Sequence, residues 1–316
     1  MRRFRCRLPL GVILAVVMLA PPAHPQMTTA QYDNARTGAY VHETKLTPRN
    51  VNSRQFGKLF TLKVDGDIYA QPLFLSGVTI PGKGKHDVVF IVTEHDSVYA
   101  FDAYGKPSTP LWHVSFVHGD VDTVPASDVM CPFTQPEVGI TSTPVIDAKS
   151  GILYVLARTK DPSLPAKVQY QQKIHALSVT SGAEKLGGPV EIKASAQGTG
   201  AGSQVTRVAF DPLRENPRAG LLLSNGLVYL TWGSSCDVGP YHGWIMAYDA
   251  ATLKQKGVFN TSPDADDSGI WASDTSPAAD KEGNVFVATG NGQFDVSSGG
   301  RDYGDTLLKL RADGQS

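Results

Sequence analysis

A short pattern of alternating apolar and polar residues recurs four times in this chain, and it restricts the possible folds more than any other feature. Its copies are SVYAFDA (97–103), KIHALSV (173–179), WIMAYDAATL (244–253) and DTLLKLRADG (305–314). Such alternation is typical of a half-buried strand that ends at a tight turn. A second apolar run precedes each copy: VVFIVTE (88–94), GILYVLA (151–157), GLVYLTW (226–232) and GNVFVAT (283–289). The chain is therefore predicted to be a repeat protein.

Two further kinds of run complete each repeat. Inner strands are predicted at IYAQPLFL (68–75), GITSTPVID (139–147), AGLLLSN (219–225) and SDTSPAAD (273–280). Outer strands are predicted at KLFTLKV (58–64), PLWHVSF (110–116), GGPVEIKA (187–194) and KGVFNTS (256–262). Four strands per repeat are typical of a β-propeller blade. We therefore expect an all-β fold, a β-propeller of four-stranded antiparallel blades with about four blades present.

The number of strands does not close the ring in an obvious way. The fourth repeat lacks an outer strand of its own, whereas the outer-type run at 58–64 stands alone near the N-terminus. That run could complete the last blade of a minimal ring. The interpretation we favour is that the repeats over 58–316 are a truncated part of a larger propeller. Insertions at 117–137, 161–171 and 197–204 lengthen the repeats.

The first 26 residues are predicted to be a signal peptide rather than part of the fold. Four arginines precede an unbroken apolar run over residues 10–20. This run is shorter than the roughly 20 residues that a membrane-spanning helix needs. The protein is thus expected to be exported to the periplasm or outside the cell, with no transmembrane span in the mature chain. A lone membrane anchor is the alternative, and the cleavage site, after Ala23 or a few residues on, stays open. A polar arm follows over 27–57.

Composition argues against a nucleic-acid partner. Removal of the four signal arginines from the 29 basic residues leaves 25 against 30 acidic residues, and no Lys or Arg cluster is present. Proteins that bind nucleic acids through the phosphate backbone carry basic patches. The many glycines and prolines suit an all-β chain with frequent turns.

Units of the form GxxYVxT, AxDxxTG and LWxxxF resemble the pyrroloquinoline-quinone (PQQ) repeats of quinoprotein dehydrogenase-like β-propellers, over about residues 57–316. This resemblance implies the propeller fold but leaves two functions open. The family contains PQQ- and calcium-dependent dehydrogenases that oxidise alcohols or sugars. It also contains cofactor-free propellers such as the scaffold lipoprotein of the bacterial outer-membrane assembly machine.

One segment is similar to the cofactor site of the dehydrogenases. GIWASDTSPAADKEGNVFVATGNGQFD (269–295) matches a stretch in which a Trp lies under the quinone and the Asn of a TGN motif binds calcium. The resemblance implies that Trp271 would stack on PQQ and that Asn291 would bind the metal. An indole suits a flat quinone, and calcium prefers oxygen ligands. The alternative is that Trp271 packs against a neighbouring blade and Asn291 forms a turn.

Other parts of the dehydrogenase pattern are missing. In the loop SSCDVGPYHGW (234–244), the position of the family's Glu ligand falls near Val238, and Asp237 is the nearest acid. The adjacent cysteine pair of many such enzymes is absent, and the family's catalytic Asp would lie beyond Ser316. The catalytic residue is therefore unknown. We favour an exported binding or scaffold module, with a PQQ-dependent dehydrogenase, or a degenerate fragment of one, as the alternative.

Several other residues are candidates for a binding site. His95 and His242 lie just before two of the AxD strands, and Glu137 precedes an inner strand, so the three could line the propeller channel. Surface or core hydrogen bonding is the alternative. Cys131 and Cys236 remain after export and either form a disulfide or stay as two independent thiols. A partner would be another exported protein or a small ligand at the loop-built face of the propeller.

Overall fold

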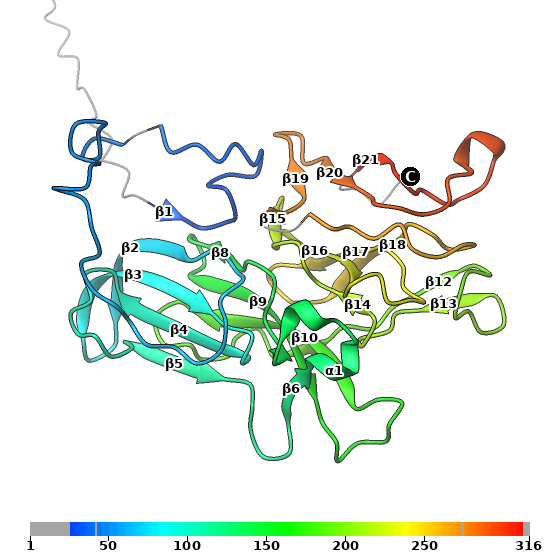
Figure 1. Ribbon diagram of the computed structural model, residues 1–316, viewed down its shortest axis with the longest axis horizontal. Coiled ribbons are helices and arrows are strands. Elements are labelled where there is room, and N and C mark those ends of the chain that lie inside the picture. The colour runs from blue at the N-terminus through cyan, green and yellow to red at the C-terminus, as the bar shows by residue number, and fades with distance from the viewer. Residues whose placement is uncertain (1–25, 42, 273–274, 312–316) are drawn as a thin grey trace, which may run out of the picture.

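The computed structural model describes residues 26–41, 43–272 and 275–311. In this part of the chain, four larger antiparallel sheets follow one another in chain order, and a separate two-stranded sheet lies in the connection between the second and the third (Figure 1). The first sheet has the strand order β1-β2-β3-β4-β5. Its strands are β1 (Gln26–Met27), β2 (Leu73–Ile80), β3 (Gly84–Val92), β4 (Ser97–Asp102) and β5 (Trp112–Ser115).

The other three sheets repeat this arrangement. In the second, β8 (Val145–Asp147), β9 (Ile152–Lys160), β10 (Tyr170–Ser178) and β11 (Val190–Glu191) run from the inner to the outer edge. The third contains β15 (Leu222–Ser224), β16 (Leu227–Ser234), β17 (Trp244–Asp249) and β18 (Gln255–Asn260), and the fourth contains β19 (Ala278–Ala279), β20 (Val285–Ala288) and β21 (Leu307–Leu310). The predicted propeller blades are therefore present, and the fourth has three strands within the described residues.

Insertions between the blades form smaller elements. The connection from β5 to β8 contains β6 (Asp122–Pro125), α1 (Ala126–Val129), η1 (Pro132–Thr134) and β7 (Glu137–Val138). The connection from β11 to β15 contains β12 (Ser195–Gln197), β13 (Arg207–Ala209) and β14 (Glu215–Asn216), and η2 (Val296–Ser298) lies between β20 and β21. None of the helices in the described ranges is long and apolar enough to span a membrane. Residues 1–25, which carry most of the predicted signal peptide, lie outside the described residues.

The hydrophobic core lies between consecutive sheets, which pack face to face. Successive side chains of a strand point to opposite faces, so the alternate residues of β9 enter two different clusters. Leu153 and Val155 pack with the first sheet, whereas Tyr154 and Leu156 pack with the third. Burial on both faces explains why the sequence of β9 is an apolar run without polar alternation.

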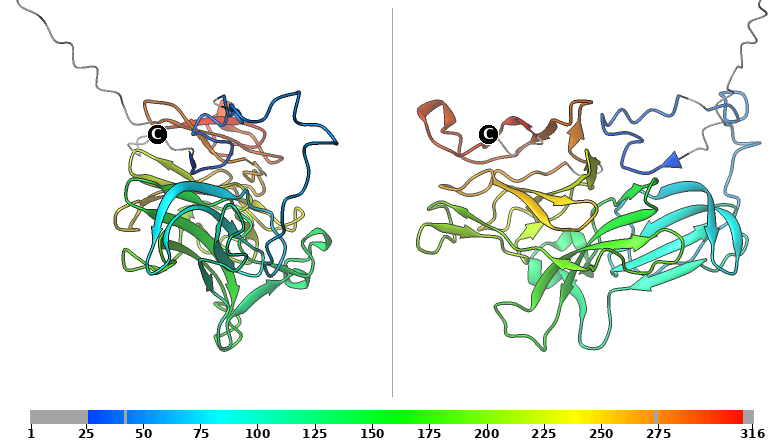
Figure 2. Two further views of the ribbon diagram at one scale, coloured as in Figure 1. Left: turned by 90° about the vertical axis from the view of Figure 1, so that its left-hand side faces the viewer. Right: turned by 180° about the vertical axis from the view of Figure 1, so that it is seen from behind.

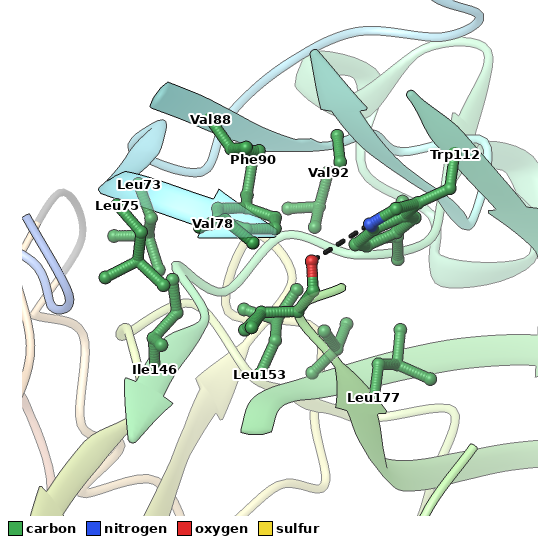
Figure 3. Close-up of a cluster of buried hydrophobic side chains, with 14 of the residues drawn as sticks. Leu73, Leu75, Val78, Val88, Phe90, Val92, Trp112, Ile146, Leu153 and Leu177 are labelled. Atoms are coloured by element: carbon green, nitrogen blue, oxygen red, sulfur yellow. Dashed lines mark hydrogen bonds between the residues drawn. The ribbon is translucent and has the colours of Figure 1, made fainter. Parts of the chain in front are cut away.

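Trp112 joins the first sheet to the second. Its indole lies in the cluster formed by β2, β3, β9 and β10, and its Nε1 donates a hydrogen bond to the carbonyl of Val179, 3.0 Å away (Figure 3). The same predicted LWxxxF strand therefore supplies both an outer edge and a contact to the next blade. Buried indole N–H groups usually find such a partner.

The N-terminal segment runs along the inner edges of all four sheets, although the sequence indicated only a polar arm there. Figure 2 shows this blue segment beside the orange-red last sheet. It pairs with β2 through Gln26 and Leu75, and its other hydrogen bonds are Ile146 N to Thr28 O (2.8 Å), Asn34 Nδ2 to Leu223 O (2.8 Å) and Ala279 N to Asn34 O (2.7 Å). Backbone groups at the inner edges thereby gain partners.

Arg36 connects the N-terminal segment to the fourth sheet through hydrogen bonds. Its Nε donates to the carbonyl of Pro277 (2.9 Å), and its Nη1 donates to Thr29 Oγ1 (2.7 Å) and to the carbonyl of Ala30 (2.9 Å). Burial lowers the pKa of the guanidinium to about 10. The charge thus lies where the segment meets the fourth sheet.

The predicted outer strand at 58–64 is wrong, because the structure has no strand there. Phe60, Leu62 and Val64 instead line a small cavity with Ile91 and Phe101, on the face of the first sheet. A segment that covers a sheet face cannot join the hydrogen-bond ladder, which requires a free edge. The apolar alternation of this run is explained by contact with that face.

Candidate functional site

All candidate site residues lie in connections at one end of the sheets. In an antiparallel four-stranded blade, the link from strand two to strand three and the link to the next blade emerge at the same end. His95 follows β3, Glu137 precedes β8, Asp237 and His242 lie between β16 and β17, Trp271 follows β18, and Asn291 follows β20. We call this end the loop face. Its residues fall into three groups.

The first group surrounds Tyr241, which is fully buried. The Tyr241 hydroxyl donates a hydrogen bond to Asp237 Oδ1, 2.8 Å away, and its ring meets the Trp271 indole edge-on at 5.9 Å. Asn291 also forms a side-chain hydrogen bond with Tyr241. The three residues implied by the dehydrogenase resemblance, Trp271, Asn291 and Asp237, are therefore brought together, with a tyrosine at their centre.

The indole of Trp271 is held on several sides. A Cβ at Gly290 would lie 2.4 Å from the indole Cδ1 and Nε1, so only glycine fits at that position. The guanidinium of Arg218 stands over the ring, 5.8 Å from the centroid, at cation–π distance. The sequence contained no signal for Arg218, which comes from the preceding blade connection. Trp271 thus contacts Tyr241 between β16 and β17 and lies close to Gly290 after β20.

The side chains around Tyr241 supply few of the oxygen ligands that a calcium ion takes. Calcium takes about six to eight oxygen ligands, and the acidic oxygens near this group come from Asp237 and Asp267. Burial, followed by the nearby charges of Asp266 and Asp237, raises the pKa of Asp267. Across the described residues, no group of three or more His, Cys, Asp or Glu side chains is placed to hold a metal ion. The Tyr241 hydroxyl is hydrogen-bonded to Asp237, and the Arg218 guanidinium already stands over the Trp271 ring.

The second group is an ion pair between two of the predicted channel residues. His95 Nδ1 lies 3.0 Å from both carboxylate oxygens of Glu137, and Thr123 Oγ1 donates to Glu137 Oε2 at 2.7 Å. The hydrogen bond to Glu137 raises the pKa of His95. The Glu137 carboxylate therefore has hydrogen-bond partners in His95 and Thr123. His242, the third predicted channel residue, lies elsewhere.

The third group is a buried polar network that the sequence did not indicate. Its carboxyl groups are Glu94, Asp96 and Glu215, and its cation is Arg158, which is completely buried. Desolvation raises the pKa of Asp96 and of Glu215 well above their ordinary values. Arg158 donates to Asn216 Oδ1 and to the carbonyl of Leu213. Carboxyl groups from two connections thus interact electrostatically with one guanidinium.

His242 belongs to this buried region and not to an open channel. Its backbone N–H donates to the Glu215 carboxylate at 3.1 Å. Its ring nitrogens lie 2.9 Å from the carbonyl oxygens of Ser262 and Ala201. The backbone N–H and both ring nitrogens of His242 thereby have partners within the protein.

The raised pKa of Glu94 predicts that the stability of the protein depends on pH. Desolvation is the main reason why its pKa rises from 4.5 to about 7, and Glu137 adds to the rise while Arg158 opposes it. Because the folded state holds this proton more tightly than the unfolded state, stability falls as pH rises from 4.5 to about 7 and then levels off. Glu94→Gln should therefore match the parent at pH 5 and exceed it by up to about 3 kcal/mol at pH 8.

Urea unfolding at the two pH values measures this difference. Glu282→Gln, at an exposed acid on the turn before β20, is the control and should match the parent at both pH values. An equal gain for Glu94→Gln at pH 5 and pH 8 would show that the proton of Glu94 is not linked to folding.

A disulfide between Cys131 and Cys236 attaches the insertion to the third blade. Their Cα atoms are 5.4 Å apart, although 105 positions separate them in the sequence. Val124, Val129 and Val138 form a small apolar cluster around Cys131. The bond thus ties α1 to the connection that carries Asp237 and Tyr241.

Comparison with known proteins supports the fold. No protein-family model matches the sequence, and no curated protein matches it. The structure is similar to quinohemoprotein alcohol dehydrogenase from Comamonas testosteroni, with a TM-score of 0.55 and 17% identity, over 92% of this chain and 40% of that chain. BamB from Moraxella catarrhalis is a weaker match, with a TM-score of 0.27 and 14% identity over 77% of this chain and 75% of that chain. A match this weak adds no argument.

The class of protein is thus an all-β propeller built from repeated four-stranded blades. More particularly, the fold is the PQQ-like β-propeller, at low sequence identity. The chain spans about two fifths of the length of the dehydrogenase that it matches. At this identity the likeness concerns the fold alone.

Proposed function

We propose that this chain is an exported PQQ-like propeller that acts as a binding module and recognises another exported protein at its loop face. The observation that carries the proposal is the arrangement around Tyr241. Its hydroxyl hydrogen bonds to Asp237, and its ring and the Arg218 guanidinium contact Trp271, so the group that corresponds to a dehydrogenase cofactor site is held together by its own side chains. A group of this kind supports a structural role for Trp271 and Asn291.

The disulfide supports export. Bonds such as that between Cys131 and Cys236 form and persist in oxidising compartments, of which the periplasm and the extracellular space are examples. The proposed location agrees with the basic and apolar pattern of the first 26 residues.

Exposed apolar side chains support binding at the loop face. Phe133 is 81% exposed and Met130 is 54% exposed, next to the disulfide at Cys131. Tyr69 donates a hydrogen bond from its hydroxyl to the carbonyl of Phe133, 3.3 Å away. Aromatic residues and Met are enriched in protein interfaces. Their anchored backbone would lose little conformational freedom on binding.

A dehydrogenase-type cofactor site is the second candidate. It is favoured by the convergence of Trp271, Asn291 and Asp237 around Tyr241 and by the fold of the Comamonas enzyme. Bound PQQ would supply electron acceptance, and Trp271 would hold its plane. The two candidates differ in whether Trp271 can offer a free face to a ligand.

Two measurements on folded protein test the proposal. In calorimetric titration of PQQ with calcium present, the parent, Trp271→Ala and the control Phe133→Ala should all show no saturable heat. Saturable heat that disappears only in Trp271→Ala would establish the cofactor site instead.

The second measurement is photo-crosslinking in the exporting cell. The photoreactive residue replaces either Phe133 or Tyr104, which is 65% exposed at the opposite end of the sheets. We expect a discrete protein adduct at Phe133 and none at Tyr104. Equal adducts, or none at Phe133, would contradict binding at the loop face.

A further inference from the structure

A cavity of about 320 Å³ lies between the first and second sheets, far along the chain from the Tyr241 group. Residues at the end of β5 form one wall, and β10 forms the other. Small-molecule sites in proteins begin at about this volume and combine apolar walls with a few polar groups. The cavity therefore has the size of a small-ligand site.

One face of β10 supplies the chemically useful wall. Lys173, His175 and Leu177 are spaced two residues apart, so their side chains point to the same face of the strand. Phe116 stacks on the His175 imidazole with ring centroids 3.7 Å apart and an interplanar angle of 19°. Val114, two residues before Phe116, adds to the apolar wall. A flat or aliphatic body would be buried between these side chains.

One acidic and one basic side chain line the cavity, and they differ in their hydrogen-bond partners. Glu184 is the acidic side chain of the lining, and both of its oxygens are used: His175 Nδ1 lies 2.8 Å from Oε2, and the Ala176 N–H donates to Oε1 at 2.8 Å. Lys173 has no hydrogen-bond or ion-pair partner for its amine among the residues described. Burial lowers the pKa of His175 in spite of Glu184, so the imidazole favours its neutral form. Both oxygens of Glu184 already accept hydrogen bonds, so the Lys173 amine is the charged group of the lining that is left to bind a ligand.

We propose that this cavity is a binding site for a small monocarboxylic acid with an apolar body. The carboxylate pairs with the Lys173 amine, and the body packs against Phe116, Val114 and Leu177. Glu184 holds the imidazole of His175 in place as part of the wall, because its carboxylate hydrogen bonds to Nδ1. A cationic ligand would find no free carboxylate there, and a purely polar ligand would leave the apolar wall without a partner.

Calorimetric titration with benzoate, and with benzamide as its neutral counterpart, tests the site. Benzoate should bind the parent protein saturably and at least about tenfold more tightly than benzamide, since a charge-assisted hydrogen bond contributes about 1.5 to 3 kcal/mol. Lys173→Met should lower benzoate affinity to the benzamide level. Lys149→Met, at an exposed lysine on the turn before β9, is the matched control and should bind benzoate as the parent does.

The same experiment can overturn the proposal in three ways. Absence of saturable benzoate binding to the folded parent would mean that the cavity is not a carboxylate site. Equal benzoate affinity in Lys173→Met and the parent would place the ligand elsewhere. Equal loss in Lys173→Met and Lys149→Met would show that only overall charge matters. Near-ultraviolet circular dichroism of each variant ensures that a loss of binding is not a loss of fold.

Discussion

Replacement of both Cys131 and Cys236 by serine should lower the free energy of unfolding by about 3 to 5 kcal/mol relative to the oxidised protein. The bond spans 105 positions, so it removes a large amount of conformational freedom from the unfolded chain. By the chain-entropy model, a loop of about 100 residues corresponds to roughly 4.7 kcal/mol. Urea unfolding of the double variant and of the parent, at one pH and temperature, measures the difference.

Reduction gives an internal control for this prediction. The single variant Cys131→Ser should be as unstable as the double variant, because either change removes the bond. Adding dithiothreitol should destabilise the parent and leave the double variant unchanged. If the double variant unfolds within about 1 kcal/mol of the parent, the apolar cluster of Val124, Val129 and Val138 would hold the insertion without help from the disulfide.

Arg158→Met should cost about 3 to 5 kcal/mol of unfolding free energy at pH 8, because it leaves buried carboxyl groups without their cation. Arg158 is completely buried and interacts electrostatically with Glu94, Asp96 and Glu215. Methionine keeps much of the volume of the side chain but supplies no charge and no donor. The loss should be smaller at pH 5, where Glu94, with a pKa of about 7, holds its proton.

A surface arginine provides the matched control for Arg158. Arg301 Nη2 lies 2.6 Å from Asp264 Oδ2, but its side chain is half exposed. Arg301→Met should therefore cost less than about 1 kcal/mol at either pH. Equal stability of Arg158→Met and the parent at pH 8 would mean that the buried carboxyl groups stay protonated there, and that the guanidinium is not needed to neutralise them.

The blade strands could be predicted from the sequence because their signal is local. The run predicted at 97–103 became β4 (Ser97–Asp102), and the run at 244–253 became β17 (Trp244–Asp249). Period-two alternation is a property of one strand and its two faces, so a short window contains it. The run at 58–64 has the same alternation and is no strand, since a single window does not show whether a free sheet edge lies beside it.

The residues that meet at the candidate site were only partly predictable. The resemblance named Trp271, Asn291 and Asp237, and these do come together. Tyr241 lies in the loop 234–244 but has no counterpart among the residues that the resemblance implies, and Arg218 lies in no motif. Their contacts cross blade boundaries, so the spacing of residues along the chain says little about them.

The sequence by itself determined the repeat, the order of four strands in each blade and the all-β class, because hydrophobic periodicity and turn residues act over a few positions. Only the tertiary structure decided that the N-terminal segment lies along four inner edges, that Arg158 is buried near carboxyl groups, and that Tyr241 contacts both Asp237 and Trp271. These features depend on packing between segments tens to hundreds of residues apart. The free energy of such contacts comes from burial and hydrogen bonds formed when the sheets stack, and no local pattern encodes it.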